Sequence, residues 1–148
     1  MSANPWTYNQ DGLATQHNAD FLRDPRFAAA YAIGIENGRP GLHIEWRVHV
    51  ALWCASQAAR LEGDFVECGV HTGILSGAVM AWLEFGKLAP RTFYLFDTWA
   101  GIPAEQVSED ERRFGVLEMN RKYQNGDATH AAAITKFSRW PNAVPVRG

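Results

Sequence analysis

The sequence predicts an α/β fold in which short parallel strands alternate with helices. Apolar runs at residues 65–69, 92–97 and 143–146 have the length and composition of strands. The first two runs are spaced like the strands of a βαβ unit of roughly 30 residues, and the alternation favours a parallel sheet covered by helices on both faces. Because proline has no N–H to donate to a neighbouring strand, Pro145 places the third run on an edge strand or itself at a strand end.

Two helices are predicted before the first strand. Asp24 and Pro25 are an N-cap and a first helical residue, so one helix begins there and ends near Gly34 or Gly38. A second helix is expected over residues 44–61, where apolar side chains recur at three- and four-residue steps.

Three further helices are predicted after the first strand. One covers residues 74–85 and joins the first two strands. Ser108 and Glu111 have the spacing of a capping box, which opens a helix that runs to about Tyr123. The last helix covers residues 128–138 and leads into the third strand.

Composition and charge narrow the classes of partner. The chain has 148 residues, 47% of them hydrophobic, and a net charge of −2, which is ordinary for one globular domain and gives no basic surface for nucleic acid or anionic membranes. A small or neutral partner fits this charge better than nucleic acid or an anionic membrane does. No apolar run approaches the roughly 18 residues of a membrane span, and the first ten residues do not resemble a signal peptide. We therefore expect a cytoplasmic protein in which Cys54 and Cys68 are buried, reduced thiols.

The turn between the first predicted strand and its helix carries the clearest functional signal. It reads E-C-G-V-H-T-G from Glu67 to Gly73. Gly69 permits a sharp turn and close approach of a ligand, while Gly73 allows tight helix packing and the helix N–H groups point at the ligand. Glu67 is an acidic residue on an apolar strand, where burial is costly unless a cation or N–H donors pair with it. The pattern favours a nucleotide-like ligand over a purely structural glycine turn.

Glycine spacing separates two ligand classes. A dinucleotide fingerprint, G-x-G-x-x-G, needs glycines where this chain has His71 and Ile74. As E-x-G-x-x-x-G, the segment matches the opening motif of class I methyltransferases, with His71 where many of them have a middle glycine. Asp97, at the end of the second strand, is placed to accept both hydroxyls of a ribose, although a solvated aspartate is the alternative.

Two motifs together resemble the macrocin O-methyltransferase family. Residues 63–70 (GDFVECGV), followed by Gly73 and Ser76, are similar to its opening motif. Residues 95–103 (LFDTWAGIP) are similar to its second motif, an Asp-Thr-aromatic-x-Gly turn. The resemblance covers residues 44–148 and is looser before them.

The resemblance implies a Rossmann-like class I methyltransferase fold, in which a sheet of order 3-2-1-4-5-7-6 binds S-adenosylmethionine at the carboxyl ends of strands 1 and 2. By position, Glu67, Gly69 and Gly73 line the methionine part and Asp97 the ribose. Trp99 either stacks on adenine or packs in the protein. The implied cofactor-binding residues are Glu67, Gly69, His71, Gly73, Ser76, Asp97, Thr98 and Trp99.

The resemblance also implies methylation of a small-molecule hydroxyl, on a sugar or natural product, with magnesium in a full-length form. The family's metal ligands and general base follow the third strand, whereas this chain ends at Gly148. We therefore expect a fold truncated after the third strand, with residues 1–43 as an N-terminal helical extension or lid and 44–148 as a partial cofactor-binding domain. No catalytic residue or metal ligand is assigned, and the isolated chain is expected to be inactive.

Two alternatives to a methyltransferase remain open at this point. The first is a non-catalytic cofactor-binding fragment or subunit, completed by a second copy or another chain. The second is a nicotinamide-dependent oxidoreductase, which shares the fold but lacks glycines at His71 and Ile74.

Overall fold

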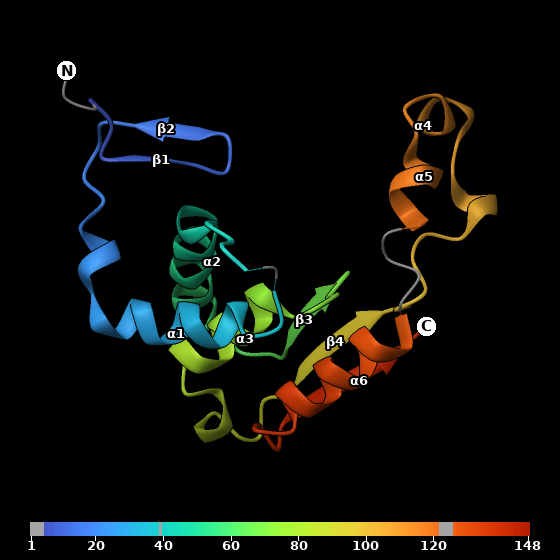
Figure 1. The fold of residues 1–148 in the computed structure, drawn as a ribbon. Coiled ribbons are helices and arrows are strands. Elements are labelled where there is room, and N and C mark those ends of the chain that lie inside the picture. The colour runs from blue at the N-terminus through green and yellow to red at the C-terminus, as the bar shows by residue number, and fades with distance from the viewer. Residues whose placement is uncertain (1–4, 39, 122–125) are drawn as a thin grey trace.

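The computed structural model describes residues 5–38, 40–121 and 126–148 and shows a three-stranded parallel sheet with helices (Figure 1). The strands β3 (Phe65–Cys68), β4 (Phe93–Asp97) and β5 (Ala143–Arg147) lie in the order β3-β4-β5. The predicted α/β class and parallel strands are thus confirmed. Pro145 lies on β5, which pairs only with β4 within the described chain, so its predicted edge position is confirmed too.

The helices of the core lie on one side of this sheet, where α1 and α2 pack against α3. Their bounds are α1 (Pro25–Ile35), α2 (Glu45–Ala58), α3 (Ile74–Trp82) and α6 (Gly126–Phe137). Phe93 and Leu95 of β4 are buried in the same cluster as Met80 of α3 and Phe137 of α6. Right-handed crossovers that run in one direction place their helices on the same side of a parallel sheet, which explains the shared face.

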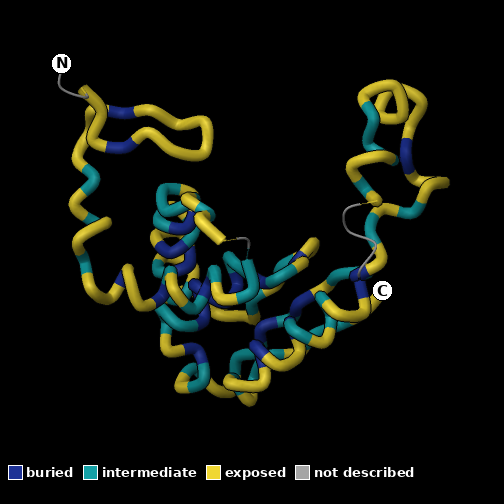
Figure 2. Tube along the Cα trace, viewed as in Figure 1, coloured by how far each residue is buried: buried dark blue, intermediate teal, exposed yellow. Residues whose placement is uncertain are grey.

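The opposite face of the sheet is open within the described chain, and exposed residues lie along its strands (Figure 2). Val66, Phe96 and Val144 project there and are 60%, 40% and 38% exposed. The prediction of a sheet covered on both faces is therefore wrong for these residues. The first strand, predicted to be buried, alternates between half-buried and exposed positions for the same reason.

Both cysteines were expected to be buried, and this is wrong. Cys54 and Cys68 are free and exposed. Cys68 lies on β3 next to Phe96 of β4, on the open side of the sheet. Cys54 neighbours Trp53 on the outer side of α2, which is also exposed. No described helix is long and apolar enough to cross a membrane.

Helix starts agree with the sequence better than helix ends. The Asp24 carboxylate accepts a hydrogen bond from the Arg26 amide at 2.8 Å, which confirms the N-cap of α1. The helix predicted to continue to residue 85 ends at Trp82, and a 3₁₀ turn, η2 (Phe85–Lys87), follows.

The capping box of Ser108 and Glu111 is confirmed, but the helix that it opens is short. Gly115 adopts a left-handed conformation with φ of 76°, which ends α4 (Glu109–Arg113) and starts α5 (Val116–Asn120). The single helix predicted up to Tyr123 is wrong over this stretch, and Tyr123 itself lies outside the described residues.

The N-terminal segment begins with a β-hairpin that the sequence analysis missed. Strands β1 (Tyr8–Gln10) and β2 (Leu13–Thr15) pair antiparallel, and a 3₁₀ helix, η1 (Asp20–Arg23), leads into α1. Asp11 and Gly12 both have positive φ, 53° and 72°. Asp-Gly between two strands is the typical signal of a two-residue hairpin turn, so the signal was present. The division of the chain into an N-terminal extension (residues 1–43) and a partial cofactor-binding domain (residues 44–148) stays a prediction.

Candidate cofactor site

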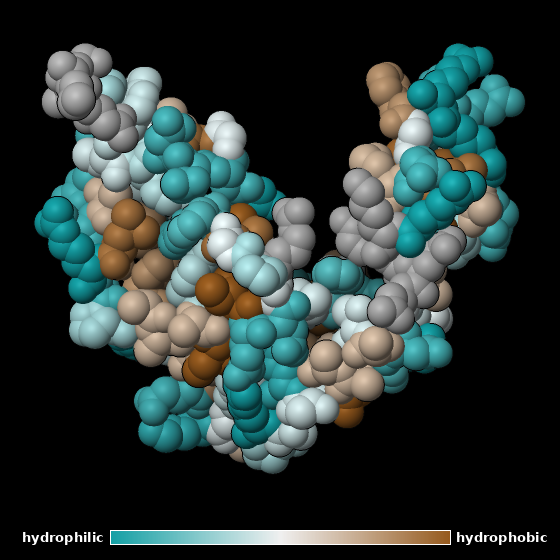
Figure 3. Space-filling model, viewed as in Figure 1, coloured by the Kyte–Doolittle hydropathy of each residue, from teal (hydrophilic) through white to brown (hydrophobic). Residues whose placement is uncertain are grey.

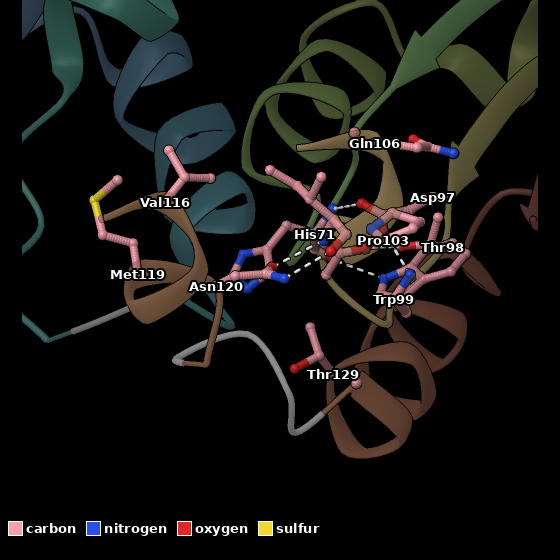
Figure 4. Close-up of a pocket in the computed structure, with 14 residues that line it drawn as sticks. His71, Asp97, Thr98, Trp99, Pro103, Gln106, Val116, Met119, Asn120 and Thr129 are labelled. Carbon is pink, nitrogen blue, oxygen red and sulfur yellow. Dashed lines mark hydrogen bonds between the residues drawn. The ribbon is translucent and has the colours of Figure 1, made fainter. Parts of the chain in front are cut away.

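A pocket of about 490 Å³ lies beyond the carboxyl ends of β3 and β4 (Figure 4). Residues that follow these two strands form one side, and side chains of α5 and α6 form the other. The surface is hollowed between the N-terminal half and the α4–α5 segment, as the space-filling view shows (Figure 3). The lining of the pocket includes Gly69, His71, Asp97, Thr98, Trp99, Ile102, Val116, Met119 and Thr129.

The Asp97 carboxylate joins the two loops that edge this pocket. Its Oδ2 accepts a hydrogen bond from the His71 amide at 2.7 Å, and its Oδ1 accepts one from the Trp99 amide at 2.6 Å. A carboxylate has about four lone-pair sites, so both oxygens retain acceptor capacity for a ligand hydroxyl. Asp97 therefore fixes the pocket's rim and can still bind a polar ligand.

His71 and Trp99 both adopt left-handed backbone conformations, with φ of 49° and 45°. L-residues rarely adopt this region because of steric crowding at Cβ, and glycine adopts it freely. The turn thus keeps the conformation that a glycine would favour, although His71 stands at the position where many class I methyltransferases have glycine. Histidine in place of glycine therefore changes the side chain at position 71 but keeps a backbone conformation that glycine also adopts.

Trp99 is packed within the protein and also forms part of the pocket wall. Its side chain is 3% exposed, its Nε1 donates to the His71 carbonyl at 2.9 Å, and its ring lies 4.6 Å from that of His130. These contacts confirm that Trp99 packs within the protein, which was one of the two roles that the sequence allowed for it. Stacking of the indole on an adenine stays a prediction.

Gly69 and Gly73 lie in different surroundings. Gly69 has φ of 83°, lines the pocket and has no atom within 4 Å of the position that a Cβ would take. Gly73 has φ of 67° and is buried, and a Cβ there would lie 2.6 Å from Cε2 of Phe137 and overlap the ring. The expected tight packing of the helix after Gly73 is confirmed, against α6, whereas Gly69 leaves space for a ligand.

Glu67 and Ser76 lie behind the turn, outside the lining of this pocket. Glu67 Oε2 and Ser76 Oγ are both buried without a hydrogen-bond partner among the described residues. Burial raises the pKa of the Glu67 carboxyl, and the nearby Ser76 hydroxyl and amide and Lys136 lower it less. Gly73 also lies outside the lining.

The sequence analysis missed residues that complete the site. Val116, Met119 and Asn120 of α5 line the pocket, as does Thr129 of α6. Asn120 also binds the loop after β4: its Oδ1 accepts from the Ile102 amide at 2.8 Å and its Nδ2 donates to the Ile102 carbonyl at 2.7 Å. No motif marks these positions, because only the path of the chain after β4 brings them to the pocket.

Comparison with known protein families decides the relationship. The model of the macrocin-O-methyltransferase (TylF) family matches residues 49–131, more than half of the chain. The chain belongs to the macrocin-O-methyltransferase family. No curated protein matches the chain.

The matched range of this macrocin-O-methyltransferase family member contains β3, the glycine turn, β4 and all the residues that line the pocket. The resemblance inferred from the two sequence motifs is therefore confirmed. Membership in a methyltransferase family makes the pocket at the ends of β3 and β4 the candidate site for a methyl-donating cofactor. Among the described residues, no group of three or more His, Cys, Asp or Glu side chains is placed to hold a metal ion.

Proposed function

We propose that this macrocin-O-methyltransferase family member binds S-adenosylmethionine in the pocket beyond β3 and β4, and that it serves methylation of a small-molecule hydroxyl. The observation that carries the proposal is the position of Asp97 at the end of β4, in the pocket wall and bonded to the turn after β3. An acidic residue there suits a ribose, because it can accept from both hydroxyls.

The dimensions and lining of the pocket fit a nucleoside. Its volume of about 490 Å³ lies within the roughly 300–1,000 Å³ of small-molecule sites. Ile102, Val116 and Met119 supply apolar surface for a flat base, and Asp97 supplies the polar group that orients a ligand. Gly69 leaves open space where any side chain would enter the pocket.

Each proposed residue has a separate task. Asp97 binds the ribose hydroxyls, while Gly69 and His71 offer backbone surface along the turn. Thr98 is held by its own loop: its Oγ1 donates to the Gly101 carbonyl at 2.9 Å, so it shapes the rim. S-adenosylmethionine supplies a methyl group already activated by its sulfonium, and the protein's main task is to align it with the acceptor oxygen. We assign no general base and no magnesium ligand.

The sheet order supports a Rossmann-like fold as part of this proposal. β5, β4 and β3 take the places of strands 3, 2 and 1, and the pocket lies at the carboxyl ends of the strands, where α/β sheets bind ligands. Completion of the catalytic half by a second copy or another chain stays a prediction, as does inactivity of the 148 residues alone.

Calorimetric titration with S-adenosylmethionine and S-adenosylhomocysteine tests the proposal. We expect both to bind, and the 2′-deoxy analogue of S-adenosylhomocysteine to bind about 10- to 100-fold more weakly, because it loses a hydrogen bond to a charged group. In Asp97→Asn the penalty for the 2′-deoxy analogue shrinks, whereas in Asp20→Asn, at an exposed position of η1, it is unchanged. Absence of binding to either cofactor, or binding of NADH instead, contradicts the proposal.

A further inference from the structure

Lys136 of α6 is a lysine whose side chain points into the protein core. It is 2% exposed, and its Nζ donates to the carbonyls of Gly34 at 2.6 Å, Gly73 at 2.9 Å and Thr72 at 3.2 Å. An ammonium has three N–H donors, so these three carbonyls match its full capacity. Buried lysines are rare and costly unless they are paired in this way.

Glycines make room for this side chain. A Cβ on Gly77 of α3 would lie 2.6 Å from Cε of Lys136 and 3.0 Å from its Nζ. A Cβ on Gly34 of α1 would lie 2.7 Å from the Ile74 carbonyl oxygen, so the end of α1 comes close to the start of α3. The three elements α1, α3 and α6 therefore meet around the Lys136 ammonium.

The charged groups around Lys136 come from three elements. Glu36 follows α1, Arg139 follows α6, and Glu67 lies on β3. The pKa of Lys136 is lowered to about 8, mainly by burial and also by the positive charge of Arg139, while the carboxylates of Glu36 and Glu67 act in the opposite direction. Glu36 is itself paired with Arg139 at 2.7 Å. The ammonium is thus held by carbonyl oxygens more than by a neighbouring carboxylate.

Two of these carbonyls belong to the turn that edges the pocket. Thr72 and Gly73 end the turn in which Gly69 and His71 line the pocket. The His71 amide is bonded to Asp97 on the pocket side, and the Thr72 and Gly73 carbonyls are bonded to Lys136 on the core side. The turn is therefore held at two points by side chains of opposite charge.

We propose that Lys136 is a positioning residue for cofactor binding, which acts by holding the Thr72 and Gly73 carbonyls so that the Gly69–Gly73 turn keeps its ligand-binding form. This inference rests on the proposed function, since it names a residue that shapes the same site without touching the ligand. A neutral amine has only two N–H donors, so loss of the proton frees one carbonyl and loosens the turn. Affinity for the cofactor then falls as the pH rises through about 8.

The pH range in which the affinity falls distinguishes loosening of the turn from unfolding of the protein. The pKa of Lys136 is lowered in the folded protein from 10.5 to about 8, so between these values the unfolded chain binds more protons. Linkage then makes the contribution of this group to the free energy of unfolding rise with pH in that window. A loss of affinity in the same window therefore reports on the turn and does not follow from global destabilisation by Lys136.

The test compares dissociation constants for S-adenosylhomocysteine across pH 6.5 to 9.5 in the wild type, Lys136→Met and Lys87→Met. Lys87 is 75% exposed and paired with Glu84, so it controls for the loss of one positive charge. We expect Lys136→Met to bind about tenfold more weakly than the wild type at pH 7, with the ratio shrinking above pH 8, because one charge-assisted hydrogen bond is worth about that factor. Titration of the ligand's own amine affects the dissociation constants of the wild type and the variant equally, so it cancels in their ratio. Lys87→Met should bind like the wild type at every pH.

A second measurement on the wild type keeps the proposal testable where Lys136→Met does not fold. Carbon-13 chemical shifts of the Gly34, Thr72 and Gly73 carbonyls should titrate together with a midpoint near 8, because burial lowers the pKa of Lys136 to about that value. Carbonyl shifts that do not change over this range, or a pH-independent affinity ratio, would overturn the proposal. Absence of any cofactor binding by the wild type at pH 7 would instead count against the proposed function.

Discussion

The Asp97 carboxylate and the His71 backbone amide lie 2.7 Å apart and join the loops that follow two neighbouring strands. This contact depends on the left-handed conformation of His71, whose φ is 49°. It links the acidic residue at the end of β4 to the glycine turn at the end of β3. The two sequence motifs therefore meet in space, and the hydrogen bond from Trp99 Nε1 to the His71 carbonyl joins them a second time.

His71 tests the strain in the turn. A left-handed conformation costs an L-residue about 1–2 kcal/mol, and glycine loses about 0.5–1 kcal/mol through its freer unfolded chain. His71→Gly should therefore change the free energy of unfolding by no more than about 1.5 kcal/mol, in the stabilising direction, while His71→Val should destabilise the protein by about 1–3 kcal/mol. Denaturant unfolding measures both, and equal stabilities of the two variants would contradict the strained backbone.

Gly69 and Gly73 should separate ligand binding from stability. Gly73→Ala combines an unfavourable φ of 67° with overlap of the Phe137 ring, so we expect a loss of about 2–4 kcal/mol. Gly69→Ala carries the backbone strain alone, about 1–2 kcal/mol, but places a methyl group in the pocket. Thermal unfolding and cofactor titration of both variants should show the larger stability loss in Gly73→Ala and the larger affinity loss at Gly69. The reverse order would place the ligand elsewhere.

Glu67 should give a pH-dependent difference in stability. Burial raises its pKa above 4.5, so in the window just above 4.5 the folded protein holds a proton that the unfolded chain has released. The stability contributed by Glu67 therefore falls as the pH rises through that window. Glu67→Gln removes this dependence, and its free energy of unfolding should rise relative to the wild type between pH 4 and pH 7. Glu105→Gln, at an exposed position, is the control, and parallel curves for Glu67→Gln and wild type would refute the assignment.

Cys54 and Cys68 should react readily in the folded protein. Both thiols are exposed, and access is one of the factors that set thiol reactivity. Native protein treated with a disulfide reagent should release two equivalents of chromophore at rates close to those of the unfolded chain. The single variants Cys54→Ser and Cys68→Ser should each release one equivalent. A protected thiol in either variant would mean that the corresponding surface is covered in solution.

Local signals in the sequence predicted much of the fold. The apolar runs of β3, β4 and β5, the N-cap at Asp24 and the capping box at Ser108 all depend on neighbours a few residues away, and each was confirmed. The missed hairpin at Asp11 and Gly12 carried a local signal of the same kind. For the site, the two motifs placed Asp97 and the glycine turn at adjacent strand ends, and the structure brings five of the expected residues to the pocket: Gly69, His71, Asp97, Thr98 and Trp99.

The sequence by itself thus determined the three parallel strands, the starts of α1 and α4, the family and the acidic residue of the pocket, because those depend on short-range pattern and spacing. Tertiary structure alone decided which sheet face is covered, that both cysteines are exposed, and that Val116 and Met119 reach the pocket. It also decided that Lys136 is buried against carbonyls from two other segments. These outcomes depend on contacts between residues far apart in the chain, and no periodicity within a single helix or strand encodes such a contact.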